Sequence, residues 1–271
     1  MPELPEVETT CRGIAPHVTG RLITRLAVHE PRLRWRVDPQ LSGWAQGQQI
    51  QAVRRRAKYL LLELTRGHLM VHLGMSGSLR VLPMSTARET HDHFDLEMDS
   101  GWLVRFNDPR RFGSLMHLTG DPATHPLLRN LAPEPLDAQF DADYLHRVTR
   151  GRKLAIKLAI MNSQLVVGVG NIYASESLFR AGIRPGRAAR SLTRAECAAL
   201  VKAIKAVLGD AIRAGGTTLR DYVGASGEPG YFRQKLFVYE RAGEPCRNCR
   251  TPIKQRVQGQ RSTYFCSRCQ V

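Results

Sequence analysis

Long hydrophobic runs are missing from this sequence of 271 residues. No apolar stretch approaches the roughly 20 residues that a membrane-spanning helix requires. A secretory signal is also missing, because the N-terminus lacks a basic region followed by an apolar one. Repeats and low-complexity tracts are absent, and 42% of the residues are hydrophobic, as in a globular protein. We therefore expect a cytoplasmic protein without a membrane partner, long enough for two domains.

Acidic residues are scarce relative to basic ones. The chain has 24 Asp and Glu against 40 Lys and Arg, which gives a net charge of +16. The excess of basic over acidic residues grows toward the C-terminus, where the last 31 residues contain seven basic residues and one acidic residue. This distribution is typical of a surface that follows a phosphate backbone. An anionic membrane is the alternative partner, but no basic amphipathic helix suited to one is evident, so nucleic acid is favoured.

The first half of the chain has the pattern of one helix followed by short strands. A helix is expected from Pro5 to Val18, because apolar residues recur at helical spacing after Val7. Gly67 and the pair Ser100-Gly101 separate the later segments as turns. Many short strands with such turns favour a β-sandwich. The predicted strands are 21–30, 59–64, 68–75, 93–98 and 102–108.

Helical patterns dominate after two closely spaced prolines near residue 133. The clearest helix is 194–214, where Thr193 and Glu196 have the spacing of a capping box. A shorter helix is expected at 172–181, and Asn171 is in position to cap it. We therefore predict an α+β chain with a β-sandwich domain at 1–130, a helical domain at 131–230 and a cysteine-bearing domain at 231–271.

Cysteine is also scarce, but four of the six cysteines form a pattern. Cys246 and Cys249 form one C-x2-C pair, and Cys266 and Cys269 form a second pair after sixteen intervening residues. Four thiolates at this spacing are typical of a tetrahedral zinc site. Two disulfides are the alternative, which a chain without a secretion signal disfavours. The pattern includes no histidine and no open position, so we expect one structural Zn²⁺ that folds a small hairpin.

The N-terminus begins MPELPEVETT. A helix start explains Pro5 and the acidic residues near it, but it does not explain Pro2 and Glu3. Removal of Met1 would leave a free secondary amine, and an α-amino group with a pKa of about 7.7–8.0 is partly neutral near pH 7. Such an amine can attack C1′ of a sugar and form an iminium ion, which acidifies the C2′ proton and permits elimination of phosphate. Glu3 is placed to protonate the ring oxygen.

Seven blocks of sequence stand out in chain order: MPELPEVET, RRAKYLLLEL, HLGMSGSLR, DPRRFG, LVVGVGNIYASESLFRAGI, GGTTLRDY, and PCRNC with QRSTYFCSRCQ. They span nearly the whole chain, and together they resemble the bacterial formamidopyrimidine-DNA glycosylase family. The resemblance implies an enzyme of base-excision repair that removes oxidised purines, chiefly 8-oxoguanine and formamidopyrimidines. It also implies strand cleavage by β- and δ-elimination, a C-terminal helix–two-turn–helix bundle and a zinc-ribbon β-hairpin.

The resemblance assigns catalytic roles to four residues. Pro2 is the Schiff-base nucleophile, and Glu3 is the proton donor. Lys58 corresponds to the lysine that donates a proton in β-elimination and contacts phosphate. Arg261 matches the arginine at the phosphate of the damaged site, which serves the δ step. The zinc ribbon is therefore expected to position a working arginine.

Three residues resemble the set that fills the space left by a flipped base. They are Met75 as an apolar wedge, Arg110 as a donor to the orphaned partner base and Phe112 as a stacking aromatic. Without the resemblance, Met75 is more simply a core residue, and Arg110 is a solvated cation at the end of a strand. The set therefore depends on the resemblance.

Other positions match DNA contacts of the family. Asn171 is expected to grip phosphate from a helix N-terminus. His91 and Arg152 match further contact positions, and Lys157 is an additional candidate. The segment 217–231 resembles the loop that closes over the flipped purine.

Two alternative functions stay open. The endonuclease VIII branch of the same superfamily prefers oxidised pyrimidines and would share Pro2 and Glu3, but the blocks ELPEVET and GGTTLRDY favour the purine branch. A zinc-ribbon protein that only binds nucleic acid would show salt-dependent affinity without a covalent adduct. The expected partner is double-stranded DNA with oxidised bases or abasic sites, bound by a monomer in the cytoplasm at the nucleoid.

Overall fold

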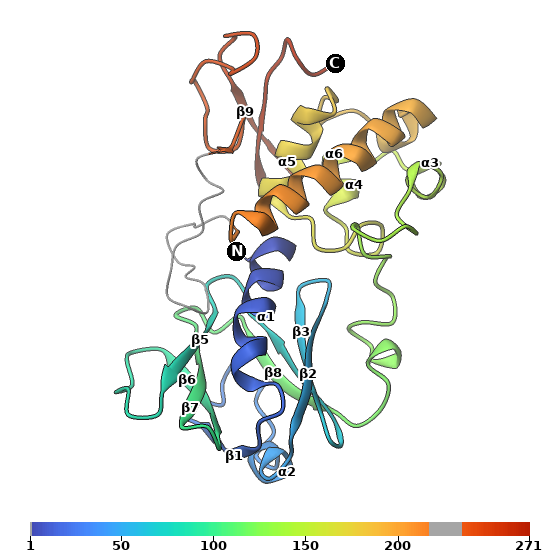
Figure 1. Cartoon of the computed structure of the whole chain (residues 1–271). Coiled ribbons are helices and arrows are strands. Elements are labelled where there is room, and N and C mark those ends of the chain that lie inside the picture. Colours follow the sequence, from blue (N-terminus) through green and yellow to red (C-terminus); the bar gives the residue numbers. More distant parts are fainter. Residues whose placement is uncertain (1, 217–234) are drawn as a thin grey trace. The chain divides into compact units, whose positions relative to one another are not determined.

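The computed structural model describes residues 2–216 and 235–271. The chain divides into two compact units (Figure 1). Unit 1 comprises Met1–Arg129 and Ala214–Tyr231, and unit 2 comprises Asn130–Arg213 and Phe232–Val271. The segment 217–231, for which a loop over the flipped base was predicted, lies outside the described residues. The division into domains at 1–130, 131–230 and 231–271 stays a prediction.

Unit 1 is built on antiparallel strands. Among its described residues, two four-stranded sheets have the orders β1-β6-β7-β5 and β2-β3-β4-β8. The strands are β1 (Ile23–Val28), β2 (Ile50–Arg56), β3 (Tyr59–Leu64), β4 (Gly67–His72), β5 (Ser78–Pro83), β6 (Asp92–Met98), β7 (Trp102–Asn107) and β8 (Ser114–Leu118). The helices are α1 (Leu4–Val18), α2 (Leu41–Ala45) and the 3-10 helix η1 (Pro122–Thr124).

The two sheets share one hydrophobic core. Leu60 and Leu69 come from one sheet and Phe94 and Leu96 from the other, and Ile14 of α1 packs into the same cluster. All five side chains are at most 3% exposed. This arrangement confirms the predicted β-sandwich, with α1 as a flanking helix.

Three strands were not predicted from the sequence, and all three are edge strands: β2, β5 and β8. Edge strands are half exposed, so their hydrophobic pattern is weak. β2 ends in three arginines, whose charges suggest a solvated turn. In the structure, Arg54 forms an ion pair with Glu63 at 3.2 Å, and Arg55 forms one with Glu8 at 2.7 Å. Carboxylates of β3 and α1 therefore neutralise two arginines of this segment, which pairs with β3 as a strand.

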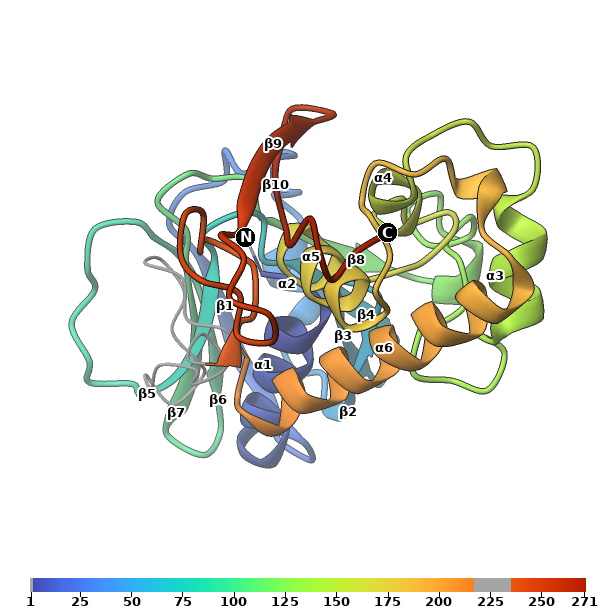
Figure 2. The ribbon, with the colours of Figure 1, turned by 90° about the horizontal axis from the view of Figure 1, so that it is seen from above.

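Unit 2 contains the helical part of the chain. Its described helices are α3 (Ala142–Thr149), α4 (Ile156–Ile160), α5 (Asn171–Arg180), η2 (Ala189–Ser191) and α6 (Arg194–Arg213). The predicted capping box is confirmed: Glu196 accepts from the Thr193 N–H at 2.8 Å, and Thr193 Oγ1 accepts from the Glu196 N–H at 3.2 Å. In Figure 2, α5 and α6 lie side by side within this unit.

A two-stranded hairpin completes unit 2. Strands β9 (Lys254–Gln258) and β10 (Arg261–Phe265) pair antiparallel. The base of the hairpin packs on α5 through a small cluster that includes Phe179, Val238, Ile253 and Tyr264. Strand β9 itself is almost entirely exposed. The hairpin therefore has little core of its own, as expected for a zinc ribbon.

Candidate functional site

Pro2 and Glu3 are buried at the start of α1. Glu3 is only 2% exposed, and its backbone N–H donates to the Glu6 carboxylate at 2.8 Å. Glu6 is buried as well, so the acidic residue in the first turn of α1 holds the residue that follows Pro2. The proline nitrogen therefore lies at the positive end of a well-anchored helix.

Lys58 lies in the two-residue turn that joins β2 and β3. The preceding Ala57 has a φ of +54°, as tight hairpin turns require. The Glu8 carboxylate accepts from Arg12 and Arg55, both at 2.7 Å, and Arg55 also donates to the Ala57 carbonyl at 3.0 Å. Burial raises the pKa of Glu8, but these guanidinium groups outweigh it and lower the pKa overall. The network ties α1, which begins beside Pro2, to the turn that carries Lys58.

Met75, Arg110 and Phe112 line one cavity of about 760 Å³ within unit 1. Phe112 is 45% exposed, and the Arg110 guanidinium lies 5.1 Å from the centre of its ring. Met75 is half-buried and therefore does not belong to the fully buried core of the sandwich. The structure thus brings the three predicted residues together. Other residues that line the cavity are Arg32, Leu33, Arg34, His72, Gly74 and Arg111.

His72, which was not predicted from the sequence, ends β4 and lines the same cavity. Its Nδ1 accepts from the Gly74 N–H at 2.9 Å. Burial, with the positive charges of Lys58 and Arg34 adding to it, lowers the pKa of His72 to about 4. The ring is therefore neutral at pH 7, and with Nδ1 as acceptor its proton lies on Nε2. The sequence held one signal for His72 as a site residue: it is a polar residue at the end of an apolar strand, three positions before Met75.

His72 leads to a prediction for stability against pH. Because its folded-state pKa lies below the value of about 6.5 for an unfolded chain, its protonation favours unfolding. Above pH 6.5, His72 therefore has no effect on the free energy of unfolding. As the pH falls from 6.5 to about 4, the free energy of unfolding decreases, because the unfolded chain binds the proton more tightly. We expect His72→Gln to remove about 1–3 kcal/mol of this acid-dependent loss. The free energy of unfolding of wild type and of His72→Gln is measured with denaturant at pH 7.5 and 4.5. If both proteins lose the same free energy between the two pH values, the prediction is wrong.

His91 is exposed at the end of the loop before β6, with a φ of +74°. A buried arginine of β7 holds this loop. Arg105 donates to both oxygens of Asp95 at 2.7 and 2.9 Å, and also to the carbonyls of Thr86 and Ala87 at 3.2 and 2.8 Å. The loop that presents His91 therefore depends on an ion pair inside the sheet.

Asn171 corrects one expectation for unit 2. Gly170 is the N-cap of α5, and Asn171 is the first helical residue. Its side chain accepts from Lys157 Nζ at 2.6 Å and donates to the Ser262 carbonyl at 3.0 Å. The side chain thus bonds across the unit instead of capping its own helix. Local rules identified a polar group at a helix start, but distant residues decide its partners.

Lys157 is buried, with no exposed area, so its suggested role as a surface contact to phosphate is wrong. Besides Asn171, its amine donates to the Ser262 carbonyl at 2.9 Å and to Thr263 Oγ1 at 2.7 Å. Ser262 directly follows Arg261, which is exposed at the start of β10. One buried ammonium group therefore joins the α5 N-terminus to the strand that carries Arg261. Arg152 lies elsewhere, exposed after α3, where it donates to the Val148 carbonyl at 2.8 Å.

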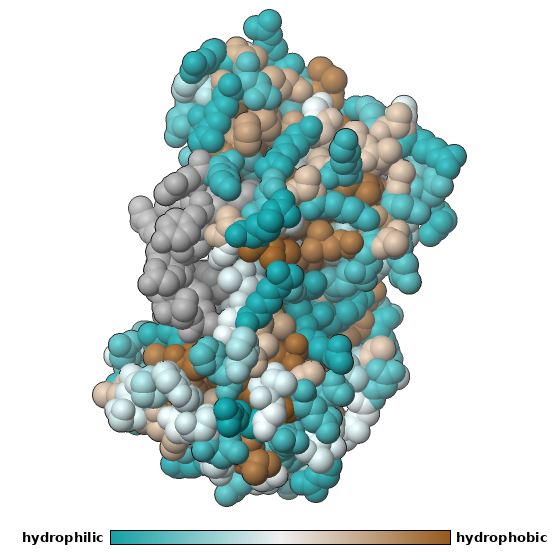
Figure 3. Space-filling model, in the orientation of Figure 1, coloured by the Kyte–Doolittle hydropathy of each residue, from teal (hydrophilic) through white to brown (hydrophobic). Residues whose placement is uncertain are grey.

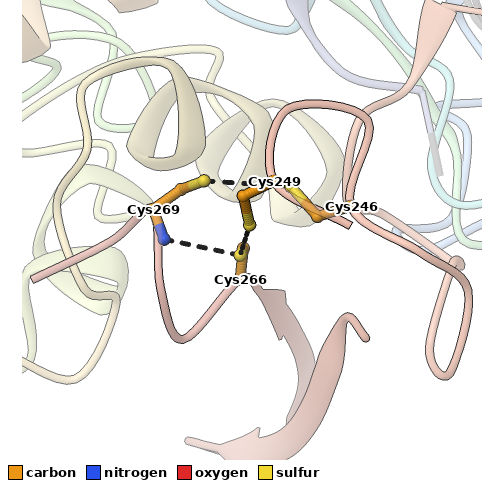
Figure 4. A group of neighbouring side chains, drawn as sticks. All are labelled: Cys246, Cys249, Cys266 and Cys269. Atoms are coloured by element: carbon orange, nitrogen blue, oxygen red, sulfur yellow. Dashed lines mark hydrogen bonds between the residues drawn. The ribbon is translucent and has the colours of Figure 1, made fainter. Parts of the chain in front are cut away.

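The four predicted cysteines converge at the base of the hairpin (Figure 4). Their sulfur atoms all lie within 4.8 Å of one another, with Cys246 and Cys269 at 3.9 Å and Cys249 and Cys266 at 3.4 Å. A zinc ion with four Zn–S bonds of about 2.3 Å requires sulfur separations of about 3.8 Å, so the geometry fits zinc. Hydrogen bonds from Thr251 lower the pKa of Cys249, whereas burial and the neighbouring sulfur atoms raise the pKa of Cys266 and Cys269. Metal binding would therefore have to displace protons from the second pair of cysteines.

Glu176 of α5 anchors the entrance to the hairpin and was also missed in the sequence. Its carboxylate accepts from the backbone N–H groups of Phe237, Val238 and Tyr239, each at 2.9 Å. The side chain is 1% exposed, and burial raises its pKa although the three hydrogen bonds act in the opposite direction. The helix that begins at Asn171 therefore also fixes the chain that enters the zinc site.

The surface of both units is mainly hydrophilic on the face drawn in Figure 3. Within residues 2–216 and 235–271, no helix is long and apolar enough to cross a bilayer.

The β-sandwich with a buried proline at its N-terminus, the helical unit built from α3 to α6 and the four-thiolate ribbon are the architecture of a DNA glycosylase of the helix–two-turn–helix class, in which the four cysteines would hold zinc. Three family models match in chain order: the formamidopyrimidine-DNA glycosylase N-terminal domain at 1–115, the H2TH domain at 131–223 and the zinc finger found in FPG and IleRS at 243–271. The chain therefore belongs to the formamidopyrimidine-DNA glycosylase family.

Relatives with this name match along their full length. The chain is 60% identical over 270 residues to the formamidopyrimidine-DNA glycosylase of Thioalkalivibrio sulfidiphilus and 57% identical to that of Pectobacterium carotovorum, with 100% of each chain covered. The MutM (Fpg) protein of Thermus thermophilus has a TM-score of 0.89 at 39% identity, covering 99% of this chain and 98% of that one. A Lactococcus lactis Fpg mutant in complex with Fapy-dG DNA has a TM-score of 0.92 at 32% identity, covering 99% of both chains.

Proposed function

We propose that this protein excises 8-oxoguanine and formamidopyrimidines from duplex DNA and then cleaves the strand by β- and δ-elimination. The observation that carries the proposal is the buried position of Pro2 and Glu3 at the anchored N-terminus of α1. The related Lactococcus lactis protein has been crystallised with DNA containing Fapy-dG and with DNA containing an abasic site. These two complexes correspond to a substrate and to an intermediate of the proposed reaction.

The reaction begins at Pro2 once Met1 has been removed. The lone pair of the proline nitrogen attacks C1′, and the bond from C1′ to the damaged base breaks, so that the base leaves with the electron pair. The departing base takes up one proton and the amine loses its N–H proton, which leaves a neutral aminal at C1′. Glu3 donates a proton to the ring oxygen as the C1′–O4′ bond opens, which leaves an iminium ion. The nitrogen has no further proton to lose, so the positive charge persists and makes the C2′ proton acidic.

Elimination then uses the remaining candidates. Loss of the C2′ proton expels the 3′ phosphate and leaves an unsaturated iminium ion. Loss of the C4′ proton then expels the 5′ phosphate, and water hydrolyses the iminium ion to release the protein. We assign proton donation and phosphate contact in the β step to Lys58 and phosphate contact in the δ step to Arg261. The position of Arg261 beside the bonds of Lys157 to Ser262 supports the second assignment. Cys246, Cys249, Cys266 and Cys269 would hold a structural zinc ion, which would keep the ribbon in shape.

We assign DNA contacts to residues of each unit. Met75, Arg110 and Phe112 fill the space vacated by the damaged nucleotide, which offsets the cost of unstacking of a few kcal/mol. Their common cavity in unit 1 supports this assignment. His91, Arg152 and Asn171 contact phosphates, as their exposed or helix-terminal positions permit.

Removal of oxidised pyrimidines, as by endonuclease VIII, is the second candidate activity. The two activities are distinguished by the damaged base that the protein removes. Duplexes with 8-oxoguanine and with thymine glycol are incubated with the protein, and borohydride is added to reduce any iminium ion. We expect cleavage and covalent trapping with 8-oxoguanine, and at least about tenfold slower reaction with thymine glycol, which corresponds to about 1.4 kcal/mol. The reverse preference identifies the pyrimidine enzyme, and binding without trapping identifies a non-catalytic DNA-binding protein.

We also propose that the protein acts as a monomer in the cytoplasm at the nucleoid, where its substrate lies. The net charge of +16 supports association with DNA. A fluorescent fusion that follows the nucleoid in living cells tests the location, and analytical ultracentrifugation tests the oligomeric state.

A further inference from the structure

Asp108 is a fully buried carboxylate between two loops of unit 1. Its Oδ1 accepts from Ser76 Oγ at 2.6 Å, and its Oδ2 accepts from the Gly113 N–H at 2.8 Å. Oδ1 also accepts from the Arg110 N–H at 3.3 Å. Ser76 directly follows Met75, and Gly113 directly follows Phe112. A single side chain therefore joins the two loops that carry the proposed wedge residues.

The backbones of these loops are in direct contact. Gly74 has a φ of +67°, and a Cβ atom there would lie 2.4 Å from the Gly113 nitrogen and 2.5 Å from the Phe112 carbonyl carbon. At Gly113, a Cβ atom would lie 2.4 Å from the Phe106 ring and 2.8 Å from the His72 carbonyl oxygen. No room remains for independent movement at this junction, so the relative placement of the loops depends on it.

The backbone of Asp108 extends the same connection toward His91. The Asp108 N–H donates to the His91 carbonyl at 3.1 Å, and the Asp108 carbonyl accepts from the Arg111 N–H at 3.1 Å. The His93 ring Nε2 lies 2.7 Å from that carbonyl, which makes it the donor of a further hydrogen bond. Asp108 is thus bonded to His91 and Arg110. It is also bonded to Ser76 and Gly113, the residues that directly follow Met75 and Phe112.

We propose that Asp108, acting through Ser76 and Gly113, is a positioning residue that preassembles the wedge formed by Met75, Arg110 and Phe112. The inference rests on the proposed function, because it explains how the wedge is ready before a base leaves the stack. Two separate loops would otherwise have to be ordered while the duplex is being unstacked. A buried carboxylate suits this task because it offers several acceptor sites in fixed directions to neutral donors on both loops.

Ser76→Ala is the sharpest test, since it removes only the link between the loops and leaves Asp108 bonded to Gly113 and Arg110. Excision of 8-oxoguanine from a duplex is expected to fall about tenfold for Ser76→Ala and about 100-fold for Asp108→Asn, because small misplacements of positioning groups have effects of this size. Ser114→Ala is the matched control. Ser114 is a buried serine of the same unit whose hydroxyl has no hydrogen-bond partner in the described structure.

A second substrate shows whether Ser76→Ala affects the placement of the wedge, the chemical step or the folding of the protein. Cleavage at a preformed abasic site in single-stranded DNA requires no base to leave a stack and no wedge, but it does require Pro2. We expect the rate on this substrate, and borohydride trapping with it, to change less than about twofold in Ser76→Ala. A variant that loses both activities equally, or that matches wild type and Ser114→Ala on the duplex, overturns the inference. A wild-type protein inactive on both substrates overturns the proposed function instead.

Discussion

Protein that retains a residue in front of Pro2 is expected to form no borohydride-trapped adduct with DNA and to lose strand cleavage by at least about 10³-fold. In such a chain the proline nitrogen belongs to a peptide bond, and its lone pair is delocalised into the carbonyl. An amide nitrogen cannot form the iminium ion on which both eliminations depend. The effect is large because the nucleophile and the electron sink are lost together.

The measurement compares two preparations of the same chain. Mass spectrometry establishes whether the N-terminus is Met1 or Pro2, and each form is incubated with an 8-oxoguanine duplex and borohydride. Pro5→Ala is the matched control, because it changes a proline in the first turn of α1 and leaves the terminal amine intact. Trapping by the form that retains Met1, or its absence from the form that begins at Pro2, contradicts the proposed mechanism.

Loss of the zinc site is expected to have the second large effect. Cys266→Ser removes a fully buried ligand of the four-cysteine cluster. Structural zinc contributes on the order of 10–16 kcal/mol to the folding of small zinc domains, and the exposed hairpin has little other core. We expect the hairpin to unfold and the hydrogen bonds from Lys157 to Ser262 and Thr263, which hold the strand that carries Arg261, to be lost, while the sandwich of unit 1 stays folded.

Zinc content and DNA binding measure this effect. Wild-type protein is expected to hold one zinc per chain and Cys266→Ser close to none. The affinity for duplex DNA is expected to fall at least about tenfold, since the phosphate contact proposed for Arg261 is lost with the hairpin. Cys197→Ala is the matched control, because Cys197 is a buried cysteine of α6 outside the cluster. Full activity of the metal-free protein, or a zinc content unchanged by Cys266→Ser, contradicts the structural role.

Patterns within a few residues predicted much of this fold. Central strands β3, β6 and β7 alternate or run apolar and were predicted almost to the residue, and the capping box of α6 is confirmed. The predicted strand 68–75 ends earlier, at His72, because Gly74 turns the chain with a φ of +67°. The edge strand β1 was predicted, but the other three edge strands, β2, β5 and β8, were missed, since they are stabilised by pairing with a neighbour and carry a weak hydrophobic pattern of their own.

The polar residues inside the molecule show the limit of such patterns. Lys157 bonds to residues 105 and 106 positions away, and Glu176 bonds to residues 61 to 63 positions away. Asp108 meets Ser76 across 32 positions. Nothing in the local sequence distinguishes these side chains from exposed charges, because their burial is created by elements that are distant in the chain.

The sequence alone identified the family, through seven ordered blocks of resemblance, and the zinc ligands, through the spacing of two C-x2-C pairs. It also predicted Pro2 as the nucleophile, which stays a prediction. The tertiary structure decided that Lys157 faces the interior, that Asn171 bonds across its unit and that one carboxylate joins the two wedge loops. These contacts depend on which chain segments folding brings together, and a buried polar group takes whatever partners that packing supplies.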